Sequence, residues 1–231
     1  MSFSFEVVKK DSGARLGVIK TPHGDIQTPA YTPVATSATV KALDTEDIVR
    51  CGSQVVLANT YHLLLRPGLE VIESFGGFAP FMKWEGPTIT DSGGYQVSFL
   101  RTSQGEVNRA DGEQEIVKIT DEGATFKSYV DGSKQLITPE RSMEIQAVLG
   151  ADIIMAFDQP LGKDYSDKKI SEAFKRTLHW EERSFIHWEK IQRTRKIRQL
   201  ADQALYGIVQ GGTNVELRRE SLKFILDTGF P

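Results

Sequence analysis

The 231-residue chain predicts a parallel α/β fold, and two observations lead to that prediction. Short apolar and β-branched runs alternate with helical patterns, which is the order of elements in parallel sheets. Single polar side chains directly follow four of the predicted strands, namely Asn59, Asp91, Asp158 and Gln210. In a (β/α)8 barrel such positions ring one mouth, where the active site lies. The barrel is therefore the predicted architecture, and a doubly wound open sheet is the alternative.

The N-terminal part is predicted to open with an antiparallel strand pair joined by the turn 10–13. Asp44 is expected to begin a short helix, because Asp47 three residues later completes a capping-box pattern, and Gly52 ends it. Another helix is expected around 69–75, before a glycine pair. The predicted strands of this part are 3–8, 15–20, 28–34 and 54–58.

The stretch 87–96 is the most informative one in the chain. Its strand-like run stops at Thr90 and continues without a gap into Asp91, Ser92, Gly93, Gly94, Tyr95 and Gln96. The two glycines permit backbone angles closed to other residues and let a ligand approach the main chain. A polar turn after a strand is the alternative interpretation.

In the C-terminal half, the polar segment 101–115 is interpreted as an exposed insertion. A small β excursion should follow over 116–119, 125–130 and 134–137, with Asp131-Gly132 as a hairpin turn. Thr138-Pro139 predicts a helix start and Gly150 its end. The remaining predicted elements are strand 153–157, one or two helices over 168–203, strand 205–209 and helix 215–227.

Composition bounds the class of protein. Hydrophobic residues make up 39% and charged residues 26%, as in ordinary globular proteins, and the net charge of −3 neither indicates nor excludes a nucleic-acid partner. Cys51 is the single cysteine, so no intrachain disulfide and no cysteine zinc cluster are expected, which fits a reducing cytoplasm. The four histidines lack metal-ligand spacing, so no metal site is expected. Neither a signal peptide nor a membrane-length apolar run is recognisable.

The polar residues after the strands indicate two kinds of chemistry. Two carboxylates on neighbouring strands are typical of glycosidic-bond cleavage or transfer, with one as acid or base. An aspartate with a glutamine also suits a purine edge, because the carboxylate accepts from ring N–H and amino groups. Tyr95 could stack on a flat base, or could be an ordinary core or rim aromatic residue.

The chain resembles the tRNA-guanine transglycosylases, also called queuine tRNA-ribosyltransferases. The shared motifs run through almost the whole chain in order: 28–30 with 33–34, 38–41, 59–63, 65–68, 90–97, 126–128, 131–132, 139–142, 155–158 and 210–211. Among them are Asn-Thr-Tyr-His-Leu from Asn59, Thr-Asp-Ser-Gly-Gly-Tyr-Gln-Val from Thr90 and Met-Ala-Phe-Asp from Met155.

The resemblance implies a (β/α)8 barrel and a pentosyltransferase that exchanges a guanine in tRNA for a deazaguanine through a covalent enzyme–RNA intermediate. In bacterial members the incoming base is the pre-queuine base and the position is the anticodon wobble guanine. Carried over by motif, Asp91 is expected to be the general base. The expected pocket residues are Asp91, Ser92, Gly93, Gly94 and Tyr95, with Asp158 and Gln210 on the purine edge and Asn59 and Gln96 in support.

Family members are much longer than this chain. Their remaining part carries a Gly-Gly segment, the aspartate nucleophile, a basic tRNA-binding motif and the cysteine–histidine zinc site, none of which is recognisable here. We therefore expect one incomplete barrel domain over 1–231 with about five of the eight strand–helix units, an N-terminal β-hairpin, a small β insertion and no cofactor. Gln159 also departs from the family's acidic residue.

Two hypotheses about function remain open. One is a truncated or split transglycosylase completed by a second polypeptide or a homodimer, and the other is a non-enzymatic partner subunit of the same family. An unrelated sugar-cleaving barrel is a more distant alternative.

Overall fold

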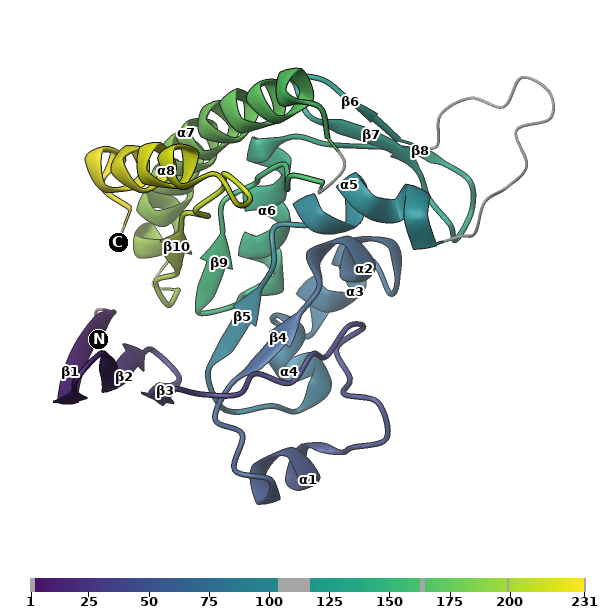
Figure 1. Cartoon of the computed structure of the whole chain (residues 1–231). Coiled ribbons are helices and arrows are strands. Elements are labelled where there is room, and N and C mark those ends of the chain that lie inside the picture. Colours follow the sequence, from purple (N-terminus) through teal and green to yellow (C-terminus); the bar gives the residue numbers. More distant parts are fainter. Residues whose placement is uncertain (1–2, 104–116, 163–164, 199, 231) are drawn as a thin grey trace. The chain divides into compact units, whose positions relative to one another are not determined.

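The structure is a computed structural model that describes residues 3–103, 117–162, 165–198 and 200–230 (Figure 1). The chain divides into two compact units, each assembled from three segments. Unit 1 comprises Met1–Asp91, Ile145–Ile154 and Glu189–Ala204, and unit 2 comprises Ser92–Glu144, Met155–Trp188 and Leu205–Pro231. The single domain over 1–231 therefore stays a prediction, and each unit is described by itself.

Unit 1 opens with an antiparallel three-stranded sheet in the order β1-β2-β3. Its strands are β1 (Ser4–Asp11), β2 (Ala14–Thr21) and β3 (Gly24–Thr28), which confirms the predicted N-terminal pair. The strand predicted over 28–34 is wrong. Pro29 and Pro33 have no backbone N–H to donate to a ladder, and only an isolated parallel bridge joins Val34 to Leu57.

Four short helices follow in unit 1: α1 (Thr45–Arg50), α2 (Thr60–Leu65), α3 (Leu69–Ser74) and α4 (Phe78–Met82). The capping box of α1 is formed as predicted, with Asp44 and Asp47 each accepting the other's backbone N–H. Helices α2 and α4 were not predicted, because five or six residues are too few to show a helical period.

The central sheet has four strands in the order β10-β9-β5-β4. These are β4 (Val56–Ala58), β5 (Thr88–Thr90), β9 (Ile153–Met155) and β10 (Ala204–Tyr206), each shorter than predicted. The β4–β5 and β5–β9 pairs are parallel, which confirms the parallel α/β class. Across the described residues there are three separate sheets and no closed barrel, and the bridge at Val34 is all that corresponds to a fifth strand.

Unit 2 contains an antiparallel sheet of β6 (Val117–Ile119), β7 (Ala124–Lys127) and β8 (Lys134–Ile137), which confirms the predicted small β excursion. The hairpin turn at Asp131-Gly132 is present, with Gly132 at φ 74°. Strand β7 ends before 130 because Ser128 already closes the turn with Ser133. Most of the predicted insertion, 104–115, lies outside the described residues, and 101–103 instead continue helix α5 (Gly94–Ser103).

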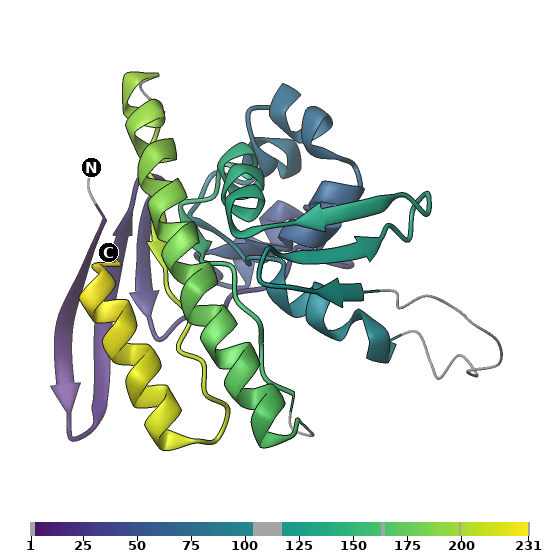
Figure 2. The same ribbon diagram turned by 90° about the horizontal axis from the view of Figure 1, so that it is seen from above.

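Three long helices complete the fold. Helix α6 (Pro139–Leu149) begins after Thr138 as predicted, and α7 (Asp167–Ile197) is one continuous helix that ends well before residue 203. Helix α8 (Val215–Thr228) starts at the Asn214 cap and ends at Gly229. It lies alongside α7 (Figure 2). The ring of Phe230, two residues after α8 ends, is 5.1 Å from the ring of Phe185 on α7. No helix in the described ranges is long and apolar enough to cross a membrane.

Candidate functional site

The first cluster of predicted site residues lies in unit 1, where β4 and β5 end. Asp91 continues the ladder after β5, since its N–H donates to the Ala58 carbonyl at 3.3 Å. Its carboxylate accepts the Thr60 N–H at 2.8 Å and the Asn59 side-chain N–H at 2.5 Å. The Thr60 hydroxyl donates to the Asp91 carbonyl oxygen. The structure thus brings Asn59 and Asp91 together and fixes the orientation of the carboxylate.

His62 lies in α2, two residues after Thr60. Burial lowers the pKa of His62, and the nearby Asp91 carboxylate opposes that shift only in part. Its usual pKa is about 6.5, so a lowered value leaves the imidazole neutral at pH 7. His62 therefore adds little positive charge beside the Asp91 carboxylate at pH 7.

The second cluster lies in unit 2 and is centred on Asp158, which is 6% exposed and follows β9. One carboxylate oxygen accepts the Gln210 side-chain N–H at 2.7 Å, and the other accepts the Ser92 hydroxyl at 3.2 Å. The Ser92 oxygen in turn accepts the Gly94 N–H at 3.1 Å. Hydrogen bonds from two donors offset the cost of burying the Asp158 carboxylate and hold it in one orientation. The carboxylate is the acceptor end of this polar network.

The glycines of the 87–96 stretch are required by this cluster. Gly93 has φ 84°, in the left-handed region that favours glycine. A Cβ on Gly94 would stand 2.2 Å from the Asp158 carbonyl oxygen and 2.9 Å from its carboxylate. The backbone of residue 94 therefore lies so close to Asp158 that no side chain larger than hydrogen fits at position 94.

Tyr95 and Gln96 lie in the first turn of α5, so the polar turn after β5 is limited to residues 91–93. The Tyr95 side chain is 63% exposed, and its ring lies 4.8 Å from that of Phe99. An exposed ring at a helix start is available to a flat ligand, which keeps the stacking prediction open. Gln96 is half-buried on the same helix.

Gln159, the residue that departs from the family pattern, has a structural role in unit 2. Its side-chain oxygen accepts the Arg176 guanidinium N–H at 2.7 Å, and Arg176 also pairs with Asp121 at 2.9 Å. The Gln159 backbone N–H donates to the Thr177 hydroxyl oxygen at 3.1 Å. The neutral Gln159 amide thus accepts a hydrogen bond from Arg176 without adding a second negative charge next to Asp158.

Sequence reasoning missed Glu181, which is fully buried on α7. Its carboxyl accepts the Ile208 N–H at 2.6 Å, two residues before Gln210. Burial raises the pKa of Glu181 to about 8; the Ile208 hydrogen bond opposes this shift and the charge of Asp158 adds to it. Nothing in the charged run 181–183 distinguishes this residue from a solvent-facing glutamate, so no local sequence signal could have identified it.

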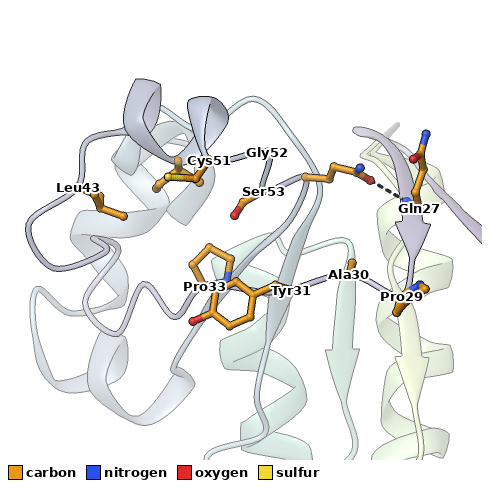
Figure 3. A pocket seen from close by; sticks show the side chains of 11 residues that line it. Gln27, Pro29, Ala30, Tyr31, Pro33, Leu43, Cys51, Gly52 and Ser53 are labelled. Atoms are coloured by element: carbon orange, nitrogen blue, oxygen red, sulfur yellow. Dashed lines mark hydrogen bonds between the residues drawn. The ribbon is translucent and has the colours of Figure 1, made fainter.

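A separate cavity of about 360 Å³ lies in unit 1 between the segments Gln27–Pro33 and Leu43–Gln54 (Figure 3). Its wall combines prolines and aliphatic side chains with Ser53, Gln54 and the exposed Cys51. It includes none of the predicted site residues. Within the described parts of the chain, no group of three His, Cys, Asp or Glu side chains is placed to hold a metal ion.

Comparison with known proteins identifies the family. The family model described as queuine tRNA-ribosyltransferase matches residues 10–231. Three relatives named queuine tRNA-ribosyltransferase illustrate the likeness. The protein of Halothermothrix orenii is 41% identical over 235 residues, covering all of this chain and 56% of its own length. That of Moorella thermoacetica is 42% identical over 230 residues, covering 99% of this chain and 56% of its own.

The third relative, from Ruegeria pomeroyi, is 42% identical over 228 residues and is matched over 55% of its length. The chain therefore spans a little over half the length of these relatives. Because the family model matches nearly the whole chain, the chain belongs to the queuine tRNA-ribosyltransferase family.

Proposed function

We propose that this chain is the base-binding part of a tRNA-guanine transglycosylase. The reaction is the exchange of guanine at the anticodon wobble position for a queuine-precursor deazaguanine, as a step of queuosine modification. The observation that carries the proposal is the buried Asp158–Gln210 pair, because the two side chains supply complementary purine-edge groups at a strand end. Family membership supports the same assignment.

Asp158 would accept hydrogen bonds from the ring N–H and exocyclic amino group of guanine. A carboxylate suits this edge because both of its oxygens are acceptors. The Gln210 amide has two N–H donors, so it can keep one on Asp158 at 2.7 Å and direct the other to the guanine carbonyl. Gly94 brings the start of α5 directly against Asp158, and Tyr95, the next residue, would stack on the flat base.

Asp91 would act as the general base of the same site. Asp91 and Ser92 are consecutive residues, so their Cα atoms are about 3.8 Å apart, and both follow a strand end. This adjacency supports the proposal that the Asn59–Asp91 cluster and the Asp158–Gln210 cluster face one cavity. Asn59 would hold Asp91 in orientation through its amide, and Gln96 would support the pocket from α5.

The architecture proposed for the whole site is a (β/α)8 barrel, of which these residues would provide the four strands of the central sheet. The relatives' greater length supports a further part that contributes the nucleophile and the family's zinc site. The proposed substrate is tRNA, and the proposed location of the reaction is the cytoplasm. A non-enzymatic partner subunit that only holds the base is the second candidate, because the Asp158–Gln210 pair can bind a base without reacting with it.

Incubation with radiolabelled guanine and unmodified tRNA tests the proposal. The 231 residues alone should incorporate no label. Double displacement needs a nucleophile that attacks the ribose carbon, and the resemblance assigns this nucleophile to the remaining part of a family domain. Addition of a polypeptide that carries the remaining part of a family domain should start incorporation, and Asp91→Ala should abolish it. Incorporation by the 231 residues alone would show that they contain the nucleophile. Guanine binding without incorporation in the completed protein would favour the partner-subunit function.

A further inference from the structure

Helix α7 carries a buried polar stripe, which we define as Thr177, Glu181 and Ser184. The spacing i, i+4 and i+7 places the three side chains on one face of the helix. Each of them is 0% exposed. Burying polar side chains is unfavourable unless they are hydrogen-bonded, so the partners of the stripe explain its presence.

Two members of the stripe hold the backbone on either side of Asp158. The Thr177 hydroxyl accepts the Gln159 N–H at 3.1 Å and is 3.2 Å from the Gln159 carbonyl oxygen, to which it can donate. The Ser184 oxygen accepts the Phe157 N–H at 3.1 Å. Both residues that flank Asp158 are therefore attached to α7, and the Phe157 ring stacks on Trp180 of the same helix.

Glu181, between them, holds the segment that carries Gln210. Its carboxyl accepts the Ile208 N–H at 2.6 Å. Ser221 of α8 fixes the same segment from another helix, because its oxygen accepts the Gln210 N–H at 3.1 Å. Gln210 then reaches Asp158 at 2.7 Å. The stripe thus connects both strand-end segments whose side chains form the proposed purine-binding pair.

We propose that the stripe on α7 positions the Asp158–Gln210 pair, and that Glu181 is its pH-sensitive member, which supports base binding only while its carboxyl is uncharged. The proposal deepens the proposed function and rests on it for the identity of the base. It assigns Glu181 no contact with the reacting atoms, so Glu181 is a positioning residue.

The surroundings of Glu181 favour the uncharged form. Its second carboxyl oxygen is buried and, within the described part of the chain, has no hydrogen-bond partner. Among the described residues, the charge that acts on it is that of Asp158, in the segment after β9, and the segment after β10 contributes the Ile208 N–H. An ionised Glu181 would place a second negative charge near Asp158 without compensation, which is unfavourable in a buried site.

The pH dependence of guanine affinity tests the proposal on the 231-residue chain. With a pKa of about 8, the uncharged fraction of Glu181 falls from about 0.9 at pH 7 to about 0.1 at pH 9. Guanine affinity measured by calorimetry should fall about tenfold over that range in the wild type. Glu181→Gln keeps the acceptor for Ile208 and cannot ionise, so it should lack this loss. Glu182→Gln, at the exposed neighbouring position, is the matched control and should behave as the wild type.

Ionisation of guanine itself affects all three proteins equally and cancels in the comparison. The same pH profile in the wild type and in Glu181→Gln would overturn the proposal. A profile that differs only in Glu181→Gln, with cooperative thermal unfolding retained by the variant at every pH used, would support it and exclude loss of the fold as the cause.

A second measurement needs no guanine, so it separates failure of this inference from failure of the proposed function. The side-chain amide signal of Gln210 and the carboxyl carbon of Glu181 are followed by NMR between pH 6 and 10. A common midpoint near pH 8 supports the proposal, and this holds even if Glu181→Gln does not fold. A Gln210 signal that does not follow the titration of Glu181 overturns it.

Discussion

Asp158→Asn is the substitution that isolates the charge of the proposed base site. The asparagine has the same size, its oxygen can accept from Gln210, and its amide can donate to the Ser92 oxygen. The hydrogen bonds of the carboxylate with Gln210 and Ser92, at 2.7 and 3.2 Å, therefore have a neutral replacement. What is lost is the negative charge, and a hydrogen bond to a charged group contributes about 1.5–3 kcal/mol. Guanine affinity should fall roughly 10- to 150-fold.

Calorimetric titration of guanine into the wild type and the variant measures this change, and thermal unfolding checks that the fold is retained. Asp152→Asn is the matched control. Asp152 is another buried aspartate, at the other end of β9, where it accepts the Thr88 N–H at 2.8 Å and lies 2.6 Å from the His23 ring nitrogen. Its substitution should lower stability without changing guanine affinity per folded molecule. Equal affinity of the wild type and Asp158→Asn would refute the reasoning and make Asp158 a structural residue.

Three further predictions concern stability, measured by thermal or denaturant unfolding. Gly94→Ala should destabilise the fold by about 1–3 kcal/mol, because the new Cβ would meet a carbonyl oxygen at 2.2 Å, whereas Gly13→Ala, with open space around it, should be nearly neutral. Partial burial would raise the pKa of Glu140, but the hydrogen bonds from Arg183, the Glu140 backbone and Thr138, together with the Arg183 charge, lower the pKa to about 2. The stabilisation from this pair should therefore be complete above pH 4.5 and be lost as the pH falls towards 2, and Glu140→Gln should remove that dependence. For Glu181, whose pKa is raised to about 8, the sign is opposite: stability should decline from pH 4.5 to 8, and Glu181→Gln should flatten the decline. A wild-type slope retained in either Gln variant would contradict that assignment.

The central strands were predictable because each is a short apolar run followed at once by a polar residue. Local β-propensity failed over 28–34, where two prolines remove the donors that a strand needs. The end of α7 was placed too late because charged residues continue to 198, although Gln203 is already held by Gln192 and by the Ala151 carbonyl. Tertiary contacts decide where such a helix ends, and the local sequence pattern carries no information about them.

The candidate site shows the same division. Asp158 and Gln210 were recognisable from their positions after strands, and the structure joins them by a hydrogen bond. The need for glycine at 94 follows from the approach of Asp158, 64 positions later in the chain, which no short stretch reveals. Glu181 was invisible for the same reason, since only the packing of α7 against the residues around 208 buries it.

The claim that both clusters form one guanine site can be tested most directly by NMR on the side-chain amides of Asn59 and Gln210. Asn59 reports on the Asp91 cluster of unit 1, and Gln210 reports on the Asp158 cluster of unit 2. During a titration with guanine, both amide signals should shift with the same midpoint, and Asp158→Asn should move the midpoint of both together. A response of Gln210 without Asn59, or of neither, would contradict the single site.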